Sequence, residues 1–242
     1  MSYYEVLSRV QVERLLGKGK TLGEGAFGTT YLVRWNNSVT VLKVLKDFVS
    51  PEAFNLEAYF LEKVNGAGGA PRLLAVSHDP PALMTTFVGR RTLGSLLLDH
   101  HLPDSYLGII ALHICLQVKE LHEIGVVHQD LHASNILVTV PKDLSFPPKV
   151  SIIDFGSAVY EESALALQPA DDRYHNMKNY DGSSVASLSE DVTYVGELLQ
   201  DIFDAMLEAA PEPARRLVQK ASSGCMDSLN ELIAGLREVL TD

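Results

Sequence analysis

The sequence is short of cysteine and of long apolar runs. Cys115 and Cys225 are its only cysteines, and both fall in apolar, helix-like stretches, which favours buried free thiols in a reducing compartment over a disulfide. No uninterrupted apolar run approaches the roughly 20 residues that cross a bilayer, so we expect no membrane insertion. The first residues lack the basic start and apolar core of a secretory signal. We therefore expect a cytoplasmic protein, with the nucleus as an alternative location.

Positive charge is also scarce. The 242 residues contain 20 Lys and Arg against 31 Asp and Glu, which gives a formal net charge of −11. Such a chain cannot neutralise nucleic-acid phosphates over a broad face, so we expect no nucleic-acid partner. With 46% apolar and 21% charged residues, the composition is that of a folded protein. The length suits one large domain or two small lobes that share a cleft.

The first hundred residues show strand patterns around one helix. Ser50-Pro51 supplies the cap and first-turn residues of a helix, which should run from about Pro51 to Val64 and end near Asn65-Gly66. Alternating and β-branched residues predict strands on both sides of a glycine turn within residues 22–33, at 38–44 and at 82–88.

Beyond Asp104 the pattern is helical. Apolar residues recur three or four positions apart up to Leu121, and Gly125 suits the end of that helix. We further expect strands at 136–140 and 150–153, a long loop at 157–189, and helices at 191–207 and 214–240. The boundary between the two regions should lie near residues 88–93, and the sequence has no internal repeat.

A glycine turn lies between the first two predicted strands. Gly23, Gly25 and Gly28 satisfy the pattern G-x-G-x-x-G, in which backbone N–H groups can approach a phosphate because no side chain intervenes. A dinucleotide-binding fold would continue as a helix, whereas residues 29–33 continue as a strand, so that interpretation fails. Taken alone, the pattern also fits a plain hairpin turn.

Two charges stand on faces that are otherwise apolar. Lys43 lies inside an apolar predicted strand, and Glu57 lies on the apolar stripe of the predicted helix. A buried ammonium needs an anionic partner, so a pair between Lys43 and Glu57 would explain both positions. The alternative is that each side chain faces solvent.

Two short polar segments complete the pattern. The segment His128-Gln-Asp-Leu-His-Ala-Ser-Asn135 contains Asp130, and Asp154-Phe-Gly156 supplies a second acid. Because Mg²⁺ prefers one or two carboxylates together with phosphate oxygens, Asn135 and Asp154 are candidate metal ligands and Asp130 is a candidate base. Taken singly, Asp154 is also compatible with a turn residue, and we interpret His128 as a core histidine.

In this order the segments resemble the protein kinase superfamily, from about residue 10 to residue 240. The glycine turn resembles the loop over ATP, and Lys43 and Glu57 resemble the strand lysine and its helix acid. Residues 128–135 resemble the catalytic loop, and residues 154–156 resemble the metal-binding triplet. Residues 191–196 look like the start of a central helix whose Asp191 braces the catalytic loop.

The resemblance implies an α+β, two-lobed protein-kinase-like fold in a single domain over residues 1–242. Residues 1–88 would form an N-lobe of antiparallel sheet plus one helix, and residues 89–242 a trimmed, mainly helical C-lobe. The implied cofactors are ATP and Mg²⁺, with Mn²⁺ as an alternative cation.

The same resemblance assigns roles to individual residues. The implied catalytic residues are Asp130, Lys43, Glu57 and His132, and the implied metal ligands are Asn135 and Asp154. The implied nucleotide-binding residues are Gly23, Gly25, Gly28, Thr30, Val41, Lys43, Thr85, Thr86, Val88 and Leu137. Among these, Thr85 would be the gatekeeper and residues 86–88 the adenine hinge.

The departures from the family pattern concern control and substrate. Gln129 replaces an arginine that usually pairs with a phosphorylated loop, so this control should be absent or different. His132 replaces the usual lysine and points partly towards small-molecule kinases of the aminoglycoside phosphotransferase type. The peptide-anchoring Ala-Pro-Glu triplet is missing, and Met226 stands in place of its arginine partner. Val41 adds bulk beside the expected adenine site.

The favoured function is therefore an ATP-dependent phosphotransferase of the EC 2.7 class. Within that class we favour a protein kinase directed at Ser or Thr over Tyr, whose partner is a protein substrate. A small-molecule kinase with a hydroxyl substrate and a pseudokinase scaffold remain as alternatives, and a regulatory partner is compatible with each. The candidate autophosphorylation sites, which are equally compatible with solvated loop residues, are Tyr174, Tyr180, Ser183 and Ser184.

Overall fold

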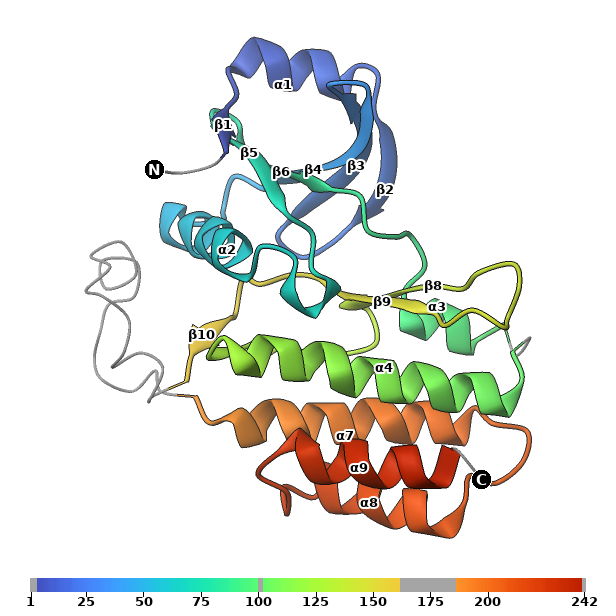
Figure 1. Ribbon diagram of the computed structural model, residues 1–242. Coiled ribbons are helices and arrows are strands. Elements are labelled where there is room, and N and C mark those ends of the chain that lie inside the picture. The colour runs from blue at the N-terminus through green and yellow to red at the C-terminus, as the bar shows by residue number, and fades with distance from the viewer. Residues whose placement is uncertain (1–3, 100–101, 162–185, 241–242) are drawn as a thin grey trace. The chain divides into compact units, whose positions relative to one another are not determined.

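The computed structural model describes residues 4–99, 102–161 and 186–240, and these residues form two compact units. The first unit comprises residues 4–66 and 70–88, and the second comprises residues 67–69 and the described residues from 89 onward. The predicted α+β fold class is confirmed, because a mixed sheet forms the first unit and the second is mainly helical (Figure 1). The four candidate autophosphorylation sites lie outside the described residues.

The first unit is built on a six-stranded sheet with the order β1-β5-β6-β4-β3-β2. Every neighbouring pair is antiparallel except β1 with β5, which is parallel. The strand predicted at 38–44 is confirmed, the one predicted at 82–88 ends earlier at Thr86, and β1 and β5 were not predicted. The strands are β1 (Glu5–Val6), β2 (Lys20–Glu24), β3 (Gly28–Trp35), β4 (Ser38–Leu45), β5 (Leu73–His78) and β6 (Pro81–Thr86).

The helix predicted in this unit is confirmed as α2 (Pro51–Val64). Its start is capped by Ser50, whose Oγ accepts a hydrogen bond of 3.2 Å from the backbone N–H of Ala53. It ends at Asn65, which adopts the left-handed conformation with φ of 41°. The buried face of α2 includes Glu57.

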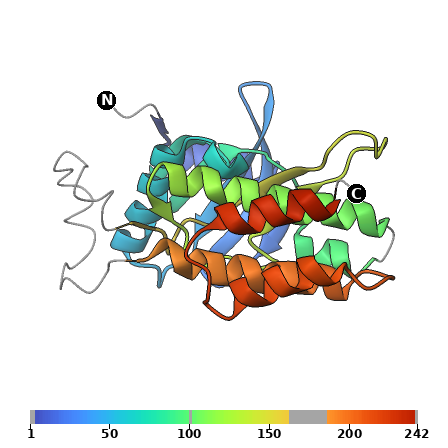
Figure 2. The same cartoon turned by 60° about the horizontal axis from the view of Figure 1, so that its bottom comes forward.

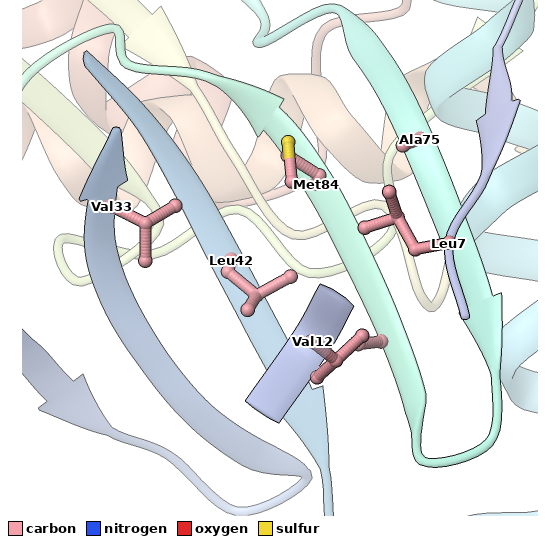
Figure 3. Packing of buried hydrophobic residues seen from close by; sticks show 7 residues of the cluster. Leu7, Val12, Val33, Leu42, Ala75 and Met84 are labelled. Carbon is pink, nitrogen blue, oxygen red and sulfur yellow. The ribbon is translucent and has the colours of Figure 1, made fainter. Parts of the chain in front are cut away.

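A second helix, α1 (Arg9–Leu16), was not predicted. It covers one face of the sheet, where Val12 is fully buried in the cluster that contains Leu42 and Met84 (Figure 3). Its eight residues, half of them polar, are too few to show a clear helical period, and so short a helix depends on tertiary packing for its stability. Because alternate residues of a strand face opposite sides, Lys43 lies on the face away from α1.

In the second unit, α4, α7, α8 and α9 run beside one another (Figures 1 and 2). The helix predicted beyond Asp104 is confirmed as α4, and Gly125 follows it with φ of 72°. The helices are η1 (Ala67–Gly69), α3 (Leu93–Leu97), α4 (Asp104–Glu123), α7 (Leu188–Asp204), α8 (Glu212–Ser222) and α9 (Leu229–Leu240). The strand pairs are β7 (Val126–Val127) with β10 (Val159–Tyr160), and β8 (Ile136–Thr139) with β9 (Lys149–Ile152).

The single helix predicted at 214–240 was wrong, because the chain turns between α8 and α9. The N–H of Gly224 donates to the carbonyl of Ala221 at 3.0 Å, and the N–H of Cys225 donates to the carbonyl of Lys220 at 3.1 Å. With φ of 70° at Gly224, these bonds form a Schellman motif that ends α8. Cys225 is consequently exposed, which corrects its prediction as a buried thiol, whereas Cys115 is buried as expected.

Two further boundaries differ from prediction. The helix expected at 191–207 is α7, which begins at Leu188 and ends at Asp204. The expected loop at 157–189 contains β10 near its start and the beginning of α7 near its end, and residues 162–185 of that stretch lie outside the described residues. None of the helices in the described part of the chain combines the length and apolar character of a membrane span.

Candidate active site

The strand register brings several predicted nucleotide-binding residues to one face of the sheet. Thr30 of β3 lies opposite Lys43 of β4, and Val41 of β4 lies opposite Thr85 of β6. Residues directly opposed on neighbouring strands share a face, and so do residues two apart on one strand. Thr30, Val41, Lys43 and Thr85 therefore line the same face, opposite the one that α1 covers.

Lys43 and Glu57, the two charges on otherwise apolar faces, form the predicted ion pair. Lys43 Nζ lies 2.7 Å from Oε1 and 2.9 Å from Oε2 of Glu57. The two side chains are only 19% and 9% exposed, so the pair is largely shielded from solvent. Each charge thus has the counter-charge that burial demands, and the pair links α2 to β4.

The three glycines of the turn differ in whether the surrounding structure requires glycine at that position. A Cβ on Gly28 would lie 2.5 Å from the carbonyl oxygen of Val44, because β3 and β4 approach closely there. A Cβ on Gly23 would meet nothing within 4 Å, and one on Gly25 would make only an ordinary contact of 3.8 Å. The sheet therefore requires Gly28, while the packing leaves Gly23 and Gly25 open to substitution.

The remaining predicted nucleotide-binding residues lie at the end of β6, just after β6 and in β8. Thr86 donates its backbone N–H to the carbonyl of Arg72 at 3.0 Å, and its Oγ1 accepts from the backbone N–H of Arg72 at 2.9 Å. Val88 is half-buried at the end of the first unit, and Leu137 is buried in the second. Their role in binding adenine stays a prediction.

An antiparallel ladder brings the two predicted metal ligands to the same end of a hairpin. Ile136 of β8 pairs with Ile152 of β9, and the N–H of Ile153 donates to the carbonyl of Asn135 at 3.0 Å. Asn135 directly precedes β8, and Asp154 directly follows Ile153, which makes the last of these hydrogen bonds. The strand pairing therefore explains why residues 19 positions apart in the sequence lie at one site.

Asn135 is oriented by Asp130. Its Nδ2 donates to the backbone carbonyl of Asp130 at 2.9 Å and to Asp130 Oδ2 at 3.2 Å. Because the amide nitrogen is engaged, the carbonyl oxygen of Asn135 is the atom that can serve a cation. One amide oxygen and one carboxylate fit Mg²⁺, which binds through few protein oxygens together with phosphates. Among the described residues, no group of three His, Cys, Asp or Glu side chains forms a metal cage.

The buried His128 joins the catalytic loop to the segment that carries Asp154. Its Nε2 lies 3.1 Å from the carbonyl of Ile153, and its Nδ1 accepts from the backbone N–H of Asp130 at 3.3 Å. These partners define a neutral ring with its proton on Nε2, and burial lowers the pKa of His128. The prediction of a core histidine is confirmed, and the ring additionally fixes the position of the loop.

Asp191 of α7 braces the same loop, as predicted. Its fully buried carboxylate accepts the backbone N–H groups of His128 at 2.8 Å and Gln129 at 2.9 Å. It also accepts from Nε2 of His122 at 3.1 Å, a contact that the sequence did not indicate because 69 residues separate the two. Gln129 adopts the left-handed conformation with φ of 64°.

His132 lies beside the candidate base. Its Nε2 is 3.7 Å from Asp130 Oδ2, and its Nδ1 accepts from the backbone N–H of Ser134 at 3.3 Å. The side chain is 51% exposed, so it faces solvent from the catalytic loop. The structure thus places His132 next to Asp130, and its catalytic role stays a prediction.

Comparison with known families agrees with this arrangement. Residues 16–180 match the family model described as the protein kinase domain, which is about two thirds of the chain. The match includes the glycine turn, the Lys43–Glu57 pair and the segment from His128 to Gly156, and it ends before α7, which supplies Asp191. The chain belongs to the protein kinase family.

Proposed function

We propose that this chain is an active protein kinase that transfers the γ-phosphoryl group of Mg-ATP to a serine or threonine hydroxyl of a protein. One observation carries the proposal: the charged and polar side chains that the chemistry needs are all present, and four of them form two local pairs. Lys43 is paired with Glu57 in the first unit, and Asp130 is hydrogen-bonded to Asn135 in the second. A chain under no demand for catalysis has no evident need for these polar pairs.

The proposed roles follow from the chemistry of phosphoryl transfer, in which positioning and charge neutralisation dominate. Asp130 orients the attacking hydroxyl and accepts its proton. Lys43 contacts the α- and β-phosphates of the nucleotide, and Glu57 holds the Lys43 amine in place. The open space at Gly23 and Gly25 supports a close approach of backbone N–H groups to phosphate.

Asn135 and Asp154 would hold the metal ion through hard oxygen atoms. A bound Mg²⁺ ion supplies charge neutralisation on the phosphate oxygens. Mn²⁺ accepts the same donor set and is the proposed alternative. Thr30, Val41, Thr85, Thr86, Val88 and Leu137 would surround the adenine. We also propose that residues 1–88 and 89–242 act as the two lobes of one domain.

The decisive experiment is a transfer assay with labelled ATP, Mg²⁺ and generic protein substrates. We expect incorporation by the purified chain and a loss of at least about a thousandfold for Asp154→Ala and Asp130→Asn, because each removes a group that acts in the transition state. Unchanged melting temperatures would show that both variants fold. Equal incorporation by Asp154→Ala, or none by the unaltered chain, would contradict the proposal.

The two alternatives predict different results with the same protein. A pseudokinase scaffold that does not bind nucleotide shows no thermal shift with Mg-ATP, whereas ATP at a hundred times its Kd stabilises a binding protein by about 2.7 kcal/mol. The presence of His132 in place of the usual lysine favours a small-molecule kinase. Such an enzyme consumes ATP when a hydroxylated metabolite is added and not when protein is added.

A further inference from the structure

The residue before the candidate base has an unusual backbone. Gln129 has φ of 64°, a left-handed conformation that costs free energy for any residue with a Cβ. The backbone angles of residue 129 set the direction of the chain at Asp130. The conformation of Gln129 therefore helps to determine where the Asp130 carboxylate lies. Neighbouring groups must stabilise it.

Two consecutive residues of α7 provide that stabilisation. Asp191 Oδ1 accepts the backbone N–H of Gln129 at 2.9 Å, and Glu190 Oε2 accepts the side-chain Nε2 of Gln129 at 3.0 Å. Asp191 is fully buried, whereas Glu190 is exposed in the first turn of the helix. The backbone and the side chain of one residue are therefore held by the same turn of α7.

We propose that Glu190 is a positioning residue that acts through Gln129 to fix the orientation of Asp130. The inference rests on the proposed function, in which Asp130 meets the acceptor hydroxyl. It also implies how this site is regulated. The neutral amide of Gln129 already has a carboxylate partner within the chain, and that carboxylate would repel an incoming phosphate. Gln129 and Glu190 together therefore disfavour the docking of a phosphorylated residue at this position.

An exchange of the two side chains tests the proposal. Gln129→Glu places two carboxylates together and breaks the contact, Glu190→Gln weakens it, and the double variant Gln129→Glu/Glu190→Gln restores an amide–carboxylate bond in the opposite direction. We expect Gln129→Glu to lower kcat about tenfold with KM for ATP changed less than about twofold, and the double variant to recover to within about threefold of the unaltered chain. Glu197→Gln makes the same chemical change at another exposed position of α7 and should leave kcat unchanged.

Hydrogen exchange of the His128 and Gln129 amides provides a readout that does not depend on transfer. Both amides donate to Asp191, so exchange should be faster in Gln129→Glu and return to the original rate in the double variant. If the unaltered chain transfers no phosphate, the proposed function fails, and the exchange pattern still decides whether Glu190 positions the loop. The inference would be overturned if kcat of the double variant stayed as low as kcat of Gln129→Glu. It would also be overturned if the two amides exchanged at the same rate in all variants.

Discussion

In the first unit the ion pair with Glu57 of α2 orients the candidate catalytic residue Lys43, whereas in the second unit a set of hydrogen bonds within the unit orients Asp130. Lys43 is held by Glu57 of one helix. Asp130 lies in a loop fixed by Asp191, by His128 and by Asn135. The difference indicates that the orientation of Lys43 depends on the placement of α2, while the geometry of Asp130 is built into the core of the second unit.

The two regions also differ in charge. Residues 1–88 contain nine Lys and Arg against eight Asp and Glu, whereas residues 89–242 contain eleven against twenty-three. The strong negative charge of the chain therefore resides almost entirely in its C-terminal region. Among the residues predicted to handle phosphate and metal, Lys43 lies in the first unit, whereas the acids Asp130 and Asp154 lie in the second.

The largest expected effect of a single change is in the second unit. Asp191→Ala leaves the buried N–H groups of His128 and Gln129 without an acceptor, which should lower the free energy of unfolding by about 3–5 kcal/mol. Urea unfolding followed by circular dichroism measures this loss. Asp201→Ala removes an exposed carboxylate from the same helix and should change stability by less than about 0.5 kcal/mol. Equal effects of the two variants would show that Asp191 does not brace the loop.

The next effect concerns the first unit. Glu57→Gln removes the counter-charge of a Lys43 amine that is largely shielded, and should lower stability by about 2 kcal/mol. Trp35, the only tryptophan, lies in this unit, so its fluorescence follows the unfolding of the first unit. The exposed Glu52 of the same helix provides the control, and Glu52→Gln should cost about 0.3–0.5 kcal/mol through the helix dipole. If the two variants unfold alike, the ion pair does not hold α2 in place.

A smaller effect distinguishes the glycines of the turn. Gly28→Ala forces a Cβ against the carbonyl oxygen of Val44 and should destabilise the first unit by about 1–3 kcal/mol. Gly23→Ala meets no neighbouring atom and should leave stability within about 0.5 kcal/mol. If Gly23 approaches phosphate as proposed, this second variant should instead raise KM for ATP. A stable Gly28→Ala protein would contradict the assignment of this glycine to strand packing.

The smallest expected effect is a dependence of stability on pH. Burial lowers the pKa of His128 below its ordinary value of 6.5, so the unfolded chain binds the proton more readily than the folded one. The stabilisation is complete above pH 6.5 and is lost as the pH falls from there towards the folded pKa.

His128→Gln keeps a donor for the Ile153 carbonyl and should reduce the slope of stability against pH by up to about 1.4 kcal/mol per pH unit. Burial also lowers the pKa of His113, so His113→Gln should remove a further, separate part of the slope. Urea unfolding between pH 5 and pH 7 measures both. An unchanged slope in His128→Gln would show that this ring is not held neutral by the fold.

The local part of the structure could be predicted from the sequence. The cap, first turn and end of α2 follow from Ser50, Pro51 and Asn65, whose conformational preferences act within a few residues. The Lys43–Glu57 pair was predictable for a different reason: each charge interrupts an apolar pattern, and pairing is the least costly explanation for both.

The sequence by itself determined the long elements such as α2, α4 and β4, the glycine turn and the set of polar residues that identify a kinase, because these depend on short-range preferences and on fixed spacing. Only the tertiary structure decided that α1 covers the sheet, that His122 meets Asp191, that Glu190 holds Gln129 and that Cys225 is exposed. Each of these depends on contacts or solvent exposure that only the assembled chain defines, and the pairs of His122 with Asp191 and Gln129 with Glu190 join residues more than sixty positions apart. No local pattern encodes such contacts, because they are stabilised only when the surrounding core has formed.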